Sequence, residues 1–389
     1  MTAIQTATAP GKTIVFVVTE DWFFASHFLP MARAAIELGL DVAVVTRVRA
    51  HRAAIEAVGA RVVPFEAERR SLNPMGAGYA AGRLAAILRD EKPDLVHCIA
   101  LRAILVGGAA CLMAGVSRRI YALTGSGLAG AEAAGRGRLA PRALRLALRS
   151  VIRGILEGAG TRYLFENAAD AQLLGLDPAD AQQVTLVGGA GVDPDAFTPV
   201  PPAPMPPLRV AVVARMLWSK GIDLAVTAAR EASARGAKVE LSLYGVPDPS
   251  NPKAISDSTL REWSTHEGVA WHGRTEDVPG VWRTHHVCCL PSRGGEGLPR
   301  TLLEGAACGR PVVTTDVPGC RDFIRDGLEG LLVAPNDVSA LADAFVRLAS
   351  DPALTARMGE AARARVLDGF TERAVMDGVK RLYATMLRD

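Results

Sequence analysis

The sequence lacks the features that would set it apart from ordinary globular proteins. Lys plus Arg total 44 and Asp plus Glu total 41, so no excess of one sign points to nucleic acid as a partner. None of the six cysteines forms a CxxC pair, and the neighbours Cys288 and Cys289 lie in an apolar run, as buried thiols in a strand do. We therefore expect reduced core cysteines and a cytoplasmic protein.

The chain also lacks the pattern of a signal peptide and an uninterrupted membrane span. Its polar start, MTAIQTATAPGKT, has no basic segment followed by an apolar one, so we do not expect export. The longest apolar stretch, 95–116, contains His97, Arg102 and two glycines, which favours a strand, a loop and a buried helix. No period of about 20–50 residues repeats, which argues against a solenoid.

Short β-branched runs alternate with Ala/Leu-rich amphipathic segments in both halves of the 389 residues. This rhythm is typical of parallel sheets covered on both faces. It stops at 201–207, where five of seven residues are proline, and this composition predicts a stiff linker. We therefore expect two doubly wound, Rossmann-like α/β domains, 1–200 and 208–370, which face each other across a cleft, and a terminal segment 371–389. Expected strands cover 13–19, 41–46, 61–65, 94–100, 118–124, 161–167, 208–216, 239–245, 269–273, 286–292 and 311–317.

A glycine-rich loop precedes a predicted helix in PSRGGEGLPRTLLEGAACGRPVV. Pro299 suits the first turn of a helix and Gly309 its end, so we expect a helix from about 298 to 308. Exposed amides at a helix start form an anion site that suits a diphosphate. Glu296 and Glu304 lie roughly 12 Å or less apart along the axis, which would let them hold hydroxyls on either side of that diphosphate. A sugar nucleotide has this layout.

Two cations follow the first strand of the second half, in ARMLWSKG. Arg215 and Lys220 would lie at the carboxyl edge of the sheet, as would the loop of Glu296. There they would neutralise a departing diphosphate, which stabilises a transition state.

A basic helix is predicted near 142–155, because six arginines and no acid occur between Arg136 and Arg153. At about 100° per residue the arginines 142, 145, 149 and 153 share one face and Leu144, Leu148, Val151 and Ile155 the other. The basic face of such a helix would suit an anionic membrane surface, and its four arginines, Arg142, Arg145, Arg149 and Arg153, form the candidate membrane patch. The alternative is a helix that packs against the core and leaves its basic face in solvent.

Histidines give weaker indications. His27 and His97 both fall at plausible cleft positions, where they would contact an acceptor, with a structural role as the alternative. His285 and His286 lack metal-ligand spacing, and we predict no metal site.

Four segments together resemble glycosyltransferase family 4, whose members are retaining enzymes of the GT-B fold. These segments are the Arg215–Lys220 loop, EGLPRTLLEGAACGRPVV, VPGCRDFIRDGLEGLLVAP and GGAGVDPDAFTP. LYGVPDPSNPKAI and TEDWFFASHFLP look like the bacterial branch that builds capsule, O-antigen and exopolysaccharide units on a polyprenyl diphosphate.

This resemblance implies roles for particular residues. Arg215 and Lys220 would bind the donor diphosphate, Glu296 the transferred sugar and Glu304 the ribose. The amides of Gly297, Leu298 and Arg300 would complete the phosphate site, and Gly245, Gly273 and Arg274 would lie at the nucleotide. Family members need no metal and no cofactor beyond the nucleotide sugar, and the pair Asp193 and Asp195 matches a turn instead of a metal site. The segment 371–389 would be a helix that crosses back to the first domain.

The sequence departs from the family pattern in the first domain. Where many relatives have a histidine, this chain has Thr124, Gly125, Ser126 and Gly127, whose amides would contact phosphate or sugar. The glycine pair common in the first βα loop is replaced by the sequence DWFF from Asp21.

We therefore interpret the sequence as that of a retaining hexosyltransferase. The enzyme would move a hexose or N-acetylhexosamine from a nucleotide diphosphate sugar, with a UDP-sugar as the expected donor, to a lipid-linked saccharide. It would act in the cytoplasm or peripherally at the inner membrane. The alternatives are an epimerase or hydrolase of the same fold, transfer to a small-molecule acceptor, and a non-catalytic sugar-binding protein.

Overall fold

The chain forms two compact units. The computed structural model describes residues 11–66, 74–125, 139–248 and 251–388. The first unit contains the described residues up to 125, those from 139 to 190 and those from 372 to 388, and the second contains those from 191 to 371. The division therefore falls after residue 190, ahead of the proline-rich segment 201–207.

The first unit is built on a seven-stranded parallel sheet with the order β3-β2-β1-β4-β5-β6-β7. The strands are β1 (Thr13–Glu20), β2 (Asp41–Arg47), β3 (Arg61–Pro64), β4 (Leu95–Ile99), β5 (Arg119–Leu123), β6 (Thr161–Phe165) and β7 (Val184–Leu186). The helices are α1 (Asp21–His27), α2 (Leu29–Glu37), α3 (Arg52–Glu56), α4 (Pro74–Glu91), α5 (Leu101–Ala114), α7 (Leu139–Val151) with a π-helical turn η1 (Ile152–Leu156), α8 (Ala168–Leu173) and α16 (Glu372–Leu387).

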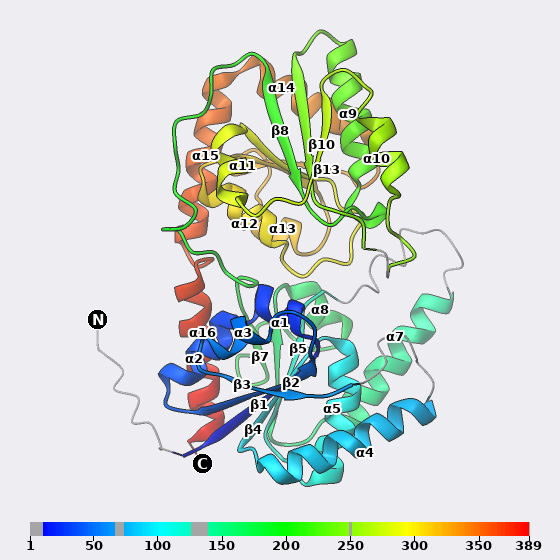
Figure 1. The fold of residues 1–389 in the computed structure, drawn as a ribbon, viewed down its shortest axis with the longest axis vertical. Helices are drawn as coiled ribbons and strands as arrows, with labels where there is room; N and C mark the ends of the chain where they lie inside the picture. The colour runs from blue at the N-terminus through cyan, green and yellow to red at the C-terminus, as the bar shows by residue number, and fades with distance from the viewer. Residues whose placement is uncertain (1–10, 67–73, 126–138, 249–250, 389) are drawn as a thin grey trace. The chain divides into compact units, whose positions relative to one another are not determined.

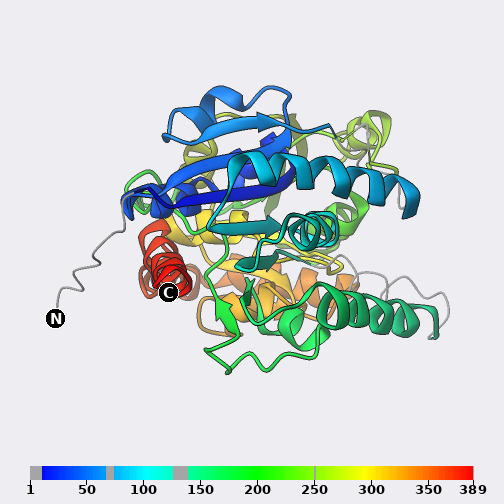
Figure 2. The ribbon, with the colours of Figure 1, turned by 90° about the horizontal axis from the view of Figure 1, so that it is seen from below.

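Helices cover both faces of this sheet (Figures 1 and 2). Successive strand residues point to opposite faces, so Phe16 packs with α1, α2 and α16 while Val15 and Val17 pack with α4 and α5. The chain end thus completes the first unit, since Val379 and Tyr383 of α16 are fully buried in its core.

The second unit has a six-stranded parallel sheet with the order β10-β9-β8-β11-β12-β13. Its strands are β8 (Leu208–Val213), β9 (Val239–Tyr244), β10 (Val269–Gly273), β11 (Val287–Leu290), β12 (Val312–Thr315) and β13 (Gly330–Val333). Its helices are η2 (Trp218–Lys220, a 3-10 turn), α9 (Ile222–Ala234), α10 (Asp257–Trp263), α11 (Val278–Thr284), α12 (Arg300–Ala307), α13 (Cys320–Phe323), α14 (Val338–Ser350) and α15 (Pro352–Leu367).

Local chemistry sets several helix starts in this unit. Asp337 and Asp351 accept hydrogen bonds from the backbone N–H groups of Ala340 and Leu354, each three residues into the turn. One face of the sheet packs against α9 and α14 and the other against α11, α12 and α15. Both faces are therefore buried, as a parallel sheet requires.

The predicted α/β architecture is confirmed, and each expected strand is present with ends shifted by no more than a few residues. The short strands β7 and β13 were not predicted. The apolar stretch 95–116 forms β4 and α5, as expected, and all six cysteines are buried and free. Within the described residues we find no helix with the length and apolar character needed to cross a bilayer.

Candidate functional site

The order of strands in the second unit marks a candidate site. The sheet is wound outwards in both directions from β8 and β11, so the connections leaving these two neighbours depart to opposite sides. In open parallel sheets this reversal leaves a crevice at the carboxyl ends of the two strands, where ligands bind. The loop after β8 carries Arg215 and Lys220, and the loop after β11 carries Glu296.

The two loops approach each other closely. Gly221 has φ +70°, and a Cβ there would lie 2.0 Å from the carbonyl oxygen of Pro291. The backbone N–H of Arg293 donates to the carbonyl of Ser219 at 2.8 Å. Only glycine permits this approach, which brings the end of η2 beside the glycine-rich loop.

Lys220 and Glu296 form an ion pair across the reversal point. Lys220 Nζ lies 2.8 and 2.7 Å from the two carboxylate oxygens of Glu296. Ser292 Oγ donates to Glu296 Oε1 at 2.7 Å. The side chains of Lys220 and Glu296 are only 18% and 11% exposed, so both charges are held in fixed positions. The sequence predicted that both residues contact a ligand but not that they contact each other.

Arg215 lies on the β9 side of the same edge. Its Nη1 is 3.6 Å from Asp248 Oδ2, on the segment that follows β9, and its side chain is 46% exposed. It is thus the more accessible of the two predicted cations.

The glycine-rich loop is held by residues that sequence reasoning missed. Arg293 makes a two-pronged ion pair with Asp223 of α9, with N–O distances of 2.8 and 2.7 Å, and its Nε donates to Asn336 Oδ1 at 2.8 Å. Gly319 has φ +83°, and a Cβ there would lie 1.6 Å from the carbonyl oxygen of Gly297. The conspicuous spacing of glycines and charges in these segments was the available signal, but partners so far apart in sequence cannot be paired from spacing alone.

Helix α12 begins later than predicted. It runs from Arg300 to Ala307, with Pro299 as the residue that precedes its first turn and Leu298 buried in the core. An expected start at 298 is therefore wrong by two residues, because Pro299 adopts an extended conformation with ψ 117°.

The carboxylate of Glu304 is bound by Arg300, one turn earlier in α12. Arg300 Nε donates to Glu304 Oε1 at 2.8 Å, and the Glu304 side chain is 11% exposed. Burial raises the pKa of Glu304 to about 7, although the Arg300 charge opposes the rise. The carboxyl of Glu304 therefore changes charge near neutral pH.

The far side of the edge holds Gly245 and Arg274. Gly245 has φ +136°, and a Cβ would lie 1.8 Å from the carbonyl of Ala214. Its N–H donates to the carbonyl of Gly273 at 2.7 Å and its carbonyl accepts from Trp271 Nε1 at 2.8 Å. Gly245 thus fixes the ends of β8, β9 and β10, and Arg274 is exposed directly after β10.

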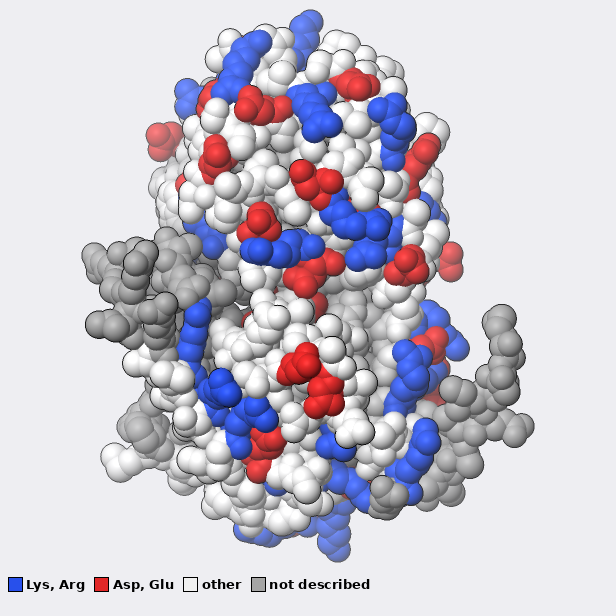
Figure 3. All heavy atoms as spheres, turned by 180° about the vertical axis from the view of Figure 1, so that it is seen from behind, with Lys and Arg blue, Asp and Glu red and all other residues white. Residues whose placement is uncertain are grey.

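Acidic and basic side chains are interspersed over the second unit on the face drawn in Figure 3, with no broad field of one sign among the described residues. Asp193 Oδ1 accepts the N–H of Asp195 at 2.9 Å, so this pair forms the predicted turn. No group of three or more potential metal-ligating side chains occurs in the part of the chain that the structure describes.

Family models match both units. One described as "Glycosyl transferase 4-like" matches residues 13–154, and one described as "Glycosyl transferases group 1" matches residues 207–351. The chain belongs to these glycosyltransferases. The resemblance to family 4 noted from the motifs is thereby confirmed.

Solved structures show the fold of this glycosyltransferase. Anabaena Alr3699/HepE, solved in complex with UDP-glucose, aligns with a TM-score of 0.75 at 16% identity, covering 96% of this chain and 99% of that one. The fold is GT-B, as expected.

Several curated relatives are named for the biosynthesis of bacterial polysaccharides, among them amylovoran, capsular polysaccharide and colanic acid. The N,N'-diacetylbacillosaminyl-diphospho-undecaprenol alpha-1,3-N-acetylgalactosaminyltransferase of Campylobacter jejuni is 22% identical over 380 residues, 93% of this chain and 96% of its own. The UDP-Gal:alpha-D-GlcNAc-diphosphoundecaprenol alpha-1,3-galactosyltransferase of Escherichia coli is 29% identical over 115 residues, 30% of this chain and 29% of its own. This glycosyltransferase spans less than half the length of several other curated relatives that it matches: the matched region covers 16%, 45% and 48% of three of them.

In the first unit of the glycosyltransferase, His97 differs from its expected role. It is fully buried in β4, and its Nδ1 lies 2.9 Å from the hydroxyl of Tyr383. Burial lowers the pKa of His97 to about 3. The prediction of an acceptor-contacting His97 is therefore wrong, because the strand directs its ring into the core. His27 is half-buried at the end of α1, 2.6 Å from Ser26 Oγ, and its role stays a prediction.

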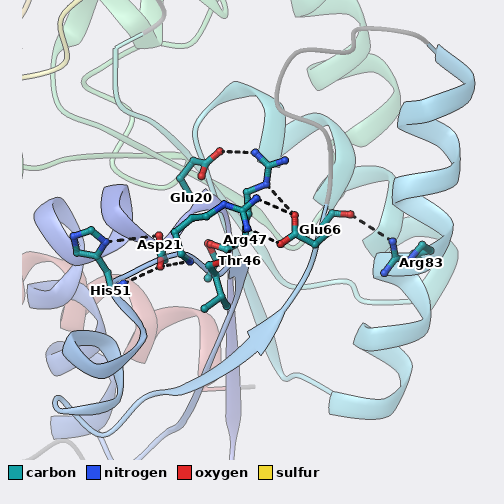
Figure 4. Close-up of polar contacts among 9 residues, drawn as sticks. Glu20, Asp21, Thr46, Arg47, His51, Glu66 and Arg83 are labelled. Carbon is teal, nitrogen blue, oxygen red and sulfur yellow. Dashed lines mark hydrogen bonds and ion pairs between the residues drawn. The ribbon is translucent and has the colours of Figure 1, made fainter. Parts of the chain in front are cut away.

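The carboxyl edge of this first sheet carries a polar network that the sequence did not reveal (Figure 4). Asp21 is fully buried and accepts the backbone N–H groups of Trp22, Arg49 and His51 at 2.7, 2.7 and 2.9 Å. Burial alone would raise the pKa of Asp21, but these donors hold it below its usual value. Arg47 bridges Glu20 at 3.2 Å and Glu66 at 3.0 Å. The carboxylate of Asp21 thus holds backbone, not ligand.

The remaining predicted residues of the first unit are only partly described. Gly125 follows β5, whereas Ser126 and Gly127 lie outside the described residues. Arg142 lies in α7, outside the residues whose side chains are described. Arg153 of η1 donates to the carbonyl of Gly175 at 2.8 Å, and the Arg149 guanidinium lies against the same glycine. These two arginines therefore contact the segment after α8.

Proposed function

We propose that this glycosyltransferase is a retaining hexosyltransferase that uses a UDP-sugar. It moves a hexose or N-acetylhexosamine to a lipid-linked saccharide during cell-surface polysaccharide synthesis. The observation that carries the proposal is the Lys220–Glu296 ion pair, 2.7 to 2.8 Å long, at the reversal point of the second sheet.

The two residues of the ion pair suit the two groups of a sugar diphosphate, Lys220 the diphosphate and Glu296 the sugar. A diphosphate entering this edge meets Lys220 and the exposed Arg215, whose charges match it. Lys220 then exchanges the carboxylate of Glu296 for phosphate oxygens. The freed carboxylate accepts hydrogen bonds from hydroxyls of the transferred sugar, with Ser292 holding Oε1 in place.

The chemistry needs no enzyme nucleophile in this proposal. The acceptor hydroxyl oxygen bonds to the anomeric carbon on the face that the phosphate leaves, and the bond from that carbon to the phosphate oxygen breaks. The acceptor proton passes to the leaving phosphate oxygen. Positive charge at the anomeric carbon is stabilised by Glu296, and the charge of UDP by Lys220 and Arg215.

Glu304 lies further along α12 and is proposed to hold the ribose hydroxyls. Its carboxyl is now bound to Arg300 at 2.8 Å, so this role requires that Arg300 releases it or that the carboxyl uses its second oxygen. The amides of Gly297 and Arg300 and the segments at Gly245 and Arg274 are proposed to complete the nucleotide site.

The acceptor assignment draws on the names of the relatives, two of which specify an undecaprenyl diphosphate. Peripheral membrane contact is proposed for α7 and η1, where Leu144, Leu146 and Ile155 are 49%, 63% and 62% exposed. Because Arg149 and Arg153 contact Gly175, these apolar side chains, more than the arginines, would enter the lipid. Leu144→Ser/Leu146→Ser should lower sedimentation with anionic vesicles; unchanged sedimentation would refute the contact.

The proposal is tested by incubating the protein with UDP-sugars and an undecaprenyl-diphosphate-linked saccharide. NMR of the product should show the anomeric configuration of the donor, and EDTA should leave the rate unchanged. Without acceptor the UDP-sugar should persist, since its conversion to an epimer or to free sugar would point to the other reaction classes. Inversion at the anomeric carbon would overturn the retaining mechanism.

A further inference from the structure

A cavity of about 570 Å³ lies at the amino edge of the second sheet, opposite the edge that carries Glu296. It is bounded by the segment 199–205, by His286 just before β11, by residues 308–311 just before β12, and by α15. All of its lining residues belong to the second unit. The cavity is therefore separate from the proposed donor site, because the two lie at opposite ends of β11.

The walls of this cavity are mainly apolar. Prolines line one side, in the segment before β8 and again before β12, and α15 supplies small or aliphatic side chains. Representative members are Pro201, Pro202, Met205, Pro311, Ala364 and Leu367. Leu367 is 53% exposed, so apolar surface reaches the solvent at this place. An aliphatic body would be stabilised here by the area it removes from water.

Two arginines line the same cavity without a carboxylate partner. Arg310 is 2% exposed and donates from Nε to the carbonyl of Trp282 at 2.7 Å and from Nη2 to that of Val200 at 3.0 Å. Arg363 donates from Nη1 to the carbonyl of Phe197 at 3.1 Å and to the carbonyl of Ala307, which leaves its Nε and Nη2 groups for a ligand. Among the described residues, no Asp or Glu forms an ion pair with either arginine. Carbonyl oxygens satisfy some of the N–H groups, but they leave the positive charge uncompensated.

The other polar side chains of the cavity do not supply the missing negative charge at Arg310. His286 accepts the N–H of Arg209 at Nδ1 (2.8 Å), and its Nε2 lies 2.7 Å from the carbonyl of Ala203, a pattern that a neutral imidazole satisfies with Nε2–H as donor. Glu360, the one acidic residue of the lining, is exposed on α15. The interior of the cavity is thus cationic and its solvent-facing wall is apolar with one acid.

We propose that this cavity binds an anionic amphiphile, a molecule with a single aliphatic chain and a carboxylate or phosphate head. The head pairs with Arg310 and Arg363, whose unused N–H groups can bind two oxygens of one acid. The chain lies along the prolines and α15. An inorganic anion would leave the apolar walls hydrated, and an uncharged lipid would leave the buried arginine charge uncompensated. The site does not depend on the proposed transferase reaction.

Isothermal titration of the full chain with decanoate and with decyl phosphate tests this site. Both should bind with one-to-one stoichiometry and compete with each other. 1-Decanol, with the same chain and no charge, and inorganic phosphate, with charge and no chain, should each bind at least about tenfold more weakly. Equal binding of 1-decanol or of phosphate would overturn the proposal, as would an absence of decanoate binding.

Filling the cavity keeps the test independent of folding defects. Ala356 and Ala364 lie exposed on α15 and line the cavity, so Ala356→Trp or Ala364→Trp should weaken decanoate binding at least about tenfold. The matched control is Ala353→Trp, which changes an exposed alanine of the same helix outside the lining. Decanoate binding that is unchanged in both cavity variants would refute the site.

A charge variant completes the experiment. Arg310→Lys keeps a cation in the cavity and should retain more decanoate affinity than Arg310→Met; equal affinities would refute the role of the charge. UDP binding by Ala356→Trp should match that of the wild type. If UDP fails to bind any variant or the wild type, the proposed function fails while the decanoate result still stands.

Discussion

The two sheets of this glycosyltransferase reverse their strand order at corresponding places, between β1 and β4 in the first and between β8 and β11 in the second, but the loops at these two places differ in length. In the second unit, residues 214–221 separate β8 from α9 and residues 291–299 separate β11 from α12. In the first unit, α1 begins directly after β1, and only Ala100 separates β4 from α5. The second unit therefore has loops long enough to present side chains and amides to a ligand, and the first does not.

Charge is also used differently at the two edges. Lys220 and Glu296 are paired with each other and remain 18% and 11% exposed, so an incoming ligand can replace either partner. Asp21 at the first edge is fully buried and bound by three backbone N–H groups, so its charge is satisfied by the backbone and its side chain is not accessible to a ligand. The comparison teaches that buried acids at a sheet edge can be structural, and that loop length distinguishes the two cases.

The largest expected effect is on the ion pair of the second unit. Glu296→Gln and Lys220→Met should each lower kcat by about 10²-fold or more, because each removes a charge that acts on the transition state. The control is Lys253→Met, an exposed lysine of the same unit, which should leave the rate unchanged. Steady-state transfer assays on variants with unaltered circular dichroism measure this, and full activity in either site variant breaks the comparison.

A glycine pair tests how tightly the second edge is built. Gly319→Ala should destabilise the protein by about 2 to 4 kcal/mol and weaken UDP binding, because its Cβ would meet the carbonyl of Gly297 at 1.6 Å. Gly327 has a similar φ of +78° but no atom within 4 Å of an added Cβ, so Gly327→Ala should cost only about 1 kcal/mol. Urea unfolding distinguishes the two, and equal losses would show that the close approach has no consequence.

A change at Asp21, on the carboxyl edge of the first sheet, should lower the free energy of unfolding and leave donor binding unchanged. Asp21→Asn should cost about 1 to 3 kcal/mol, since one oxygen must then serve three N–H groups. The folded pKa of Asp21 is lower than the usual 3.8, so its contribution is complete above about pH 5 and is lost as pH falls through the folded pKa. The difference in unfolding free energy between wild type and variant should shrink between pH 5 and 3. A change in UDP affinity at neutral pH would contradict the structural role.

The smallest effect is expected at Glu304. Its folded pKa of about 7 exceeds the usual 4.5, so the folded state binds the extra proton and stability falls as pH rises between these values. Glu304→Gln should therefore gain stability relative to wild type, by on the order of 1 kcal/mol, between pH 5 and 8. Thermal unfolding across this range measures the change, and parallel curves would show that Glu304 ionises normally.

Much of the fold was predictable because parallel strands and helices have distinct periods. The run 14–18 is apolar throughout, as a strand buried on both faces requires, and it lies within β1. β7 and β13 were not predicted, and β7, with three residues, is too short to show a pattern. The strand that contains His97 was predictable, but the direction of the His97 ring toward Tyr383 was not, since α16 is remote in sequence.

The candidate site was predictable in its residues and not in its contacts. Strand ends placed Lys220 and Glu296 on one edge, and the glycine loop marked where the chain turns. Their mutual ion pair, the Arg293–Asp223 clamp and the contact of Gly319 with Gly297 join positions separated by tens of residues. Such pairings follow from strand order, which the periodicity of a single chain does not determine.

The most direct test of the central claim is isothermal titration of the wild type, Lys220→Met and Glu296→Gln with UDP and with the UDP-sugar that the wild type uses. Lys220→Met should lose affinity for both ligands, because both contain the diphosphate. Glu296→Gln should lose affinity for the UDP-sugar and keep that for UDP. Wild-type affinity of both variants for both ligands would show that the donor does not bind at this edge.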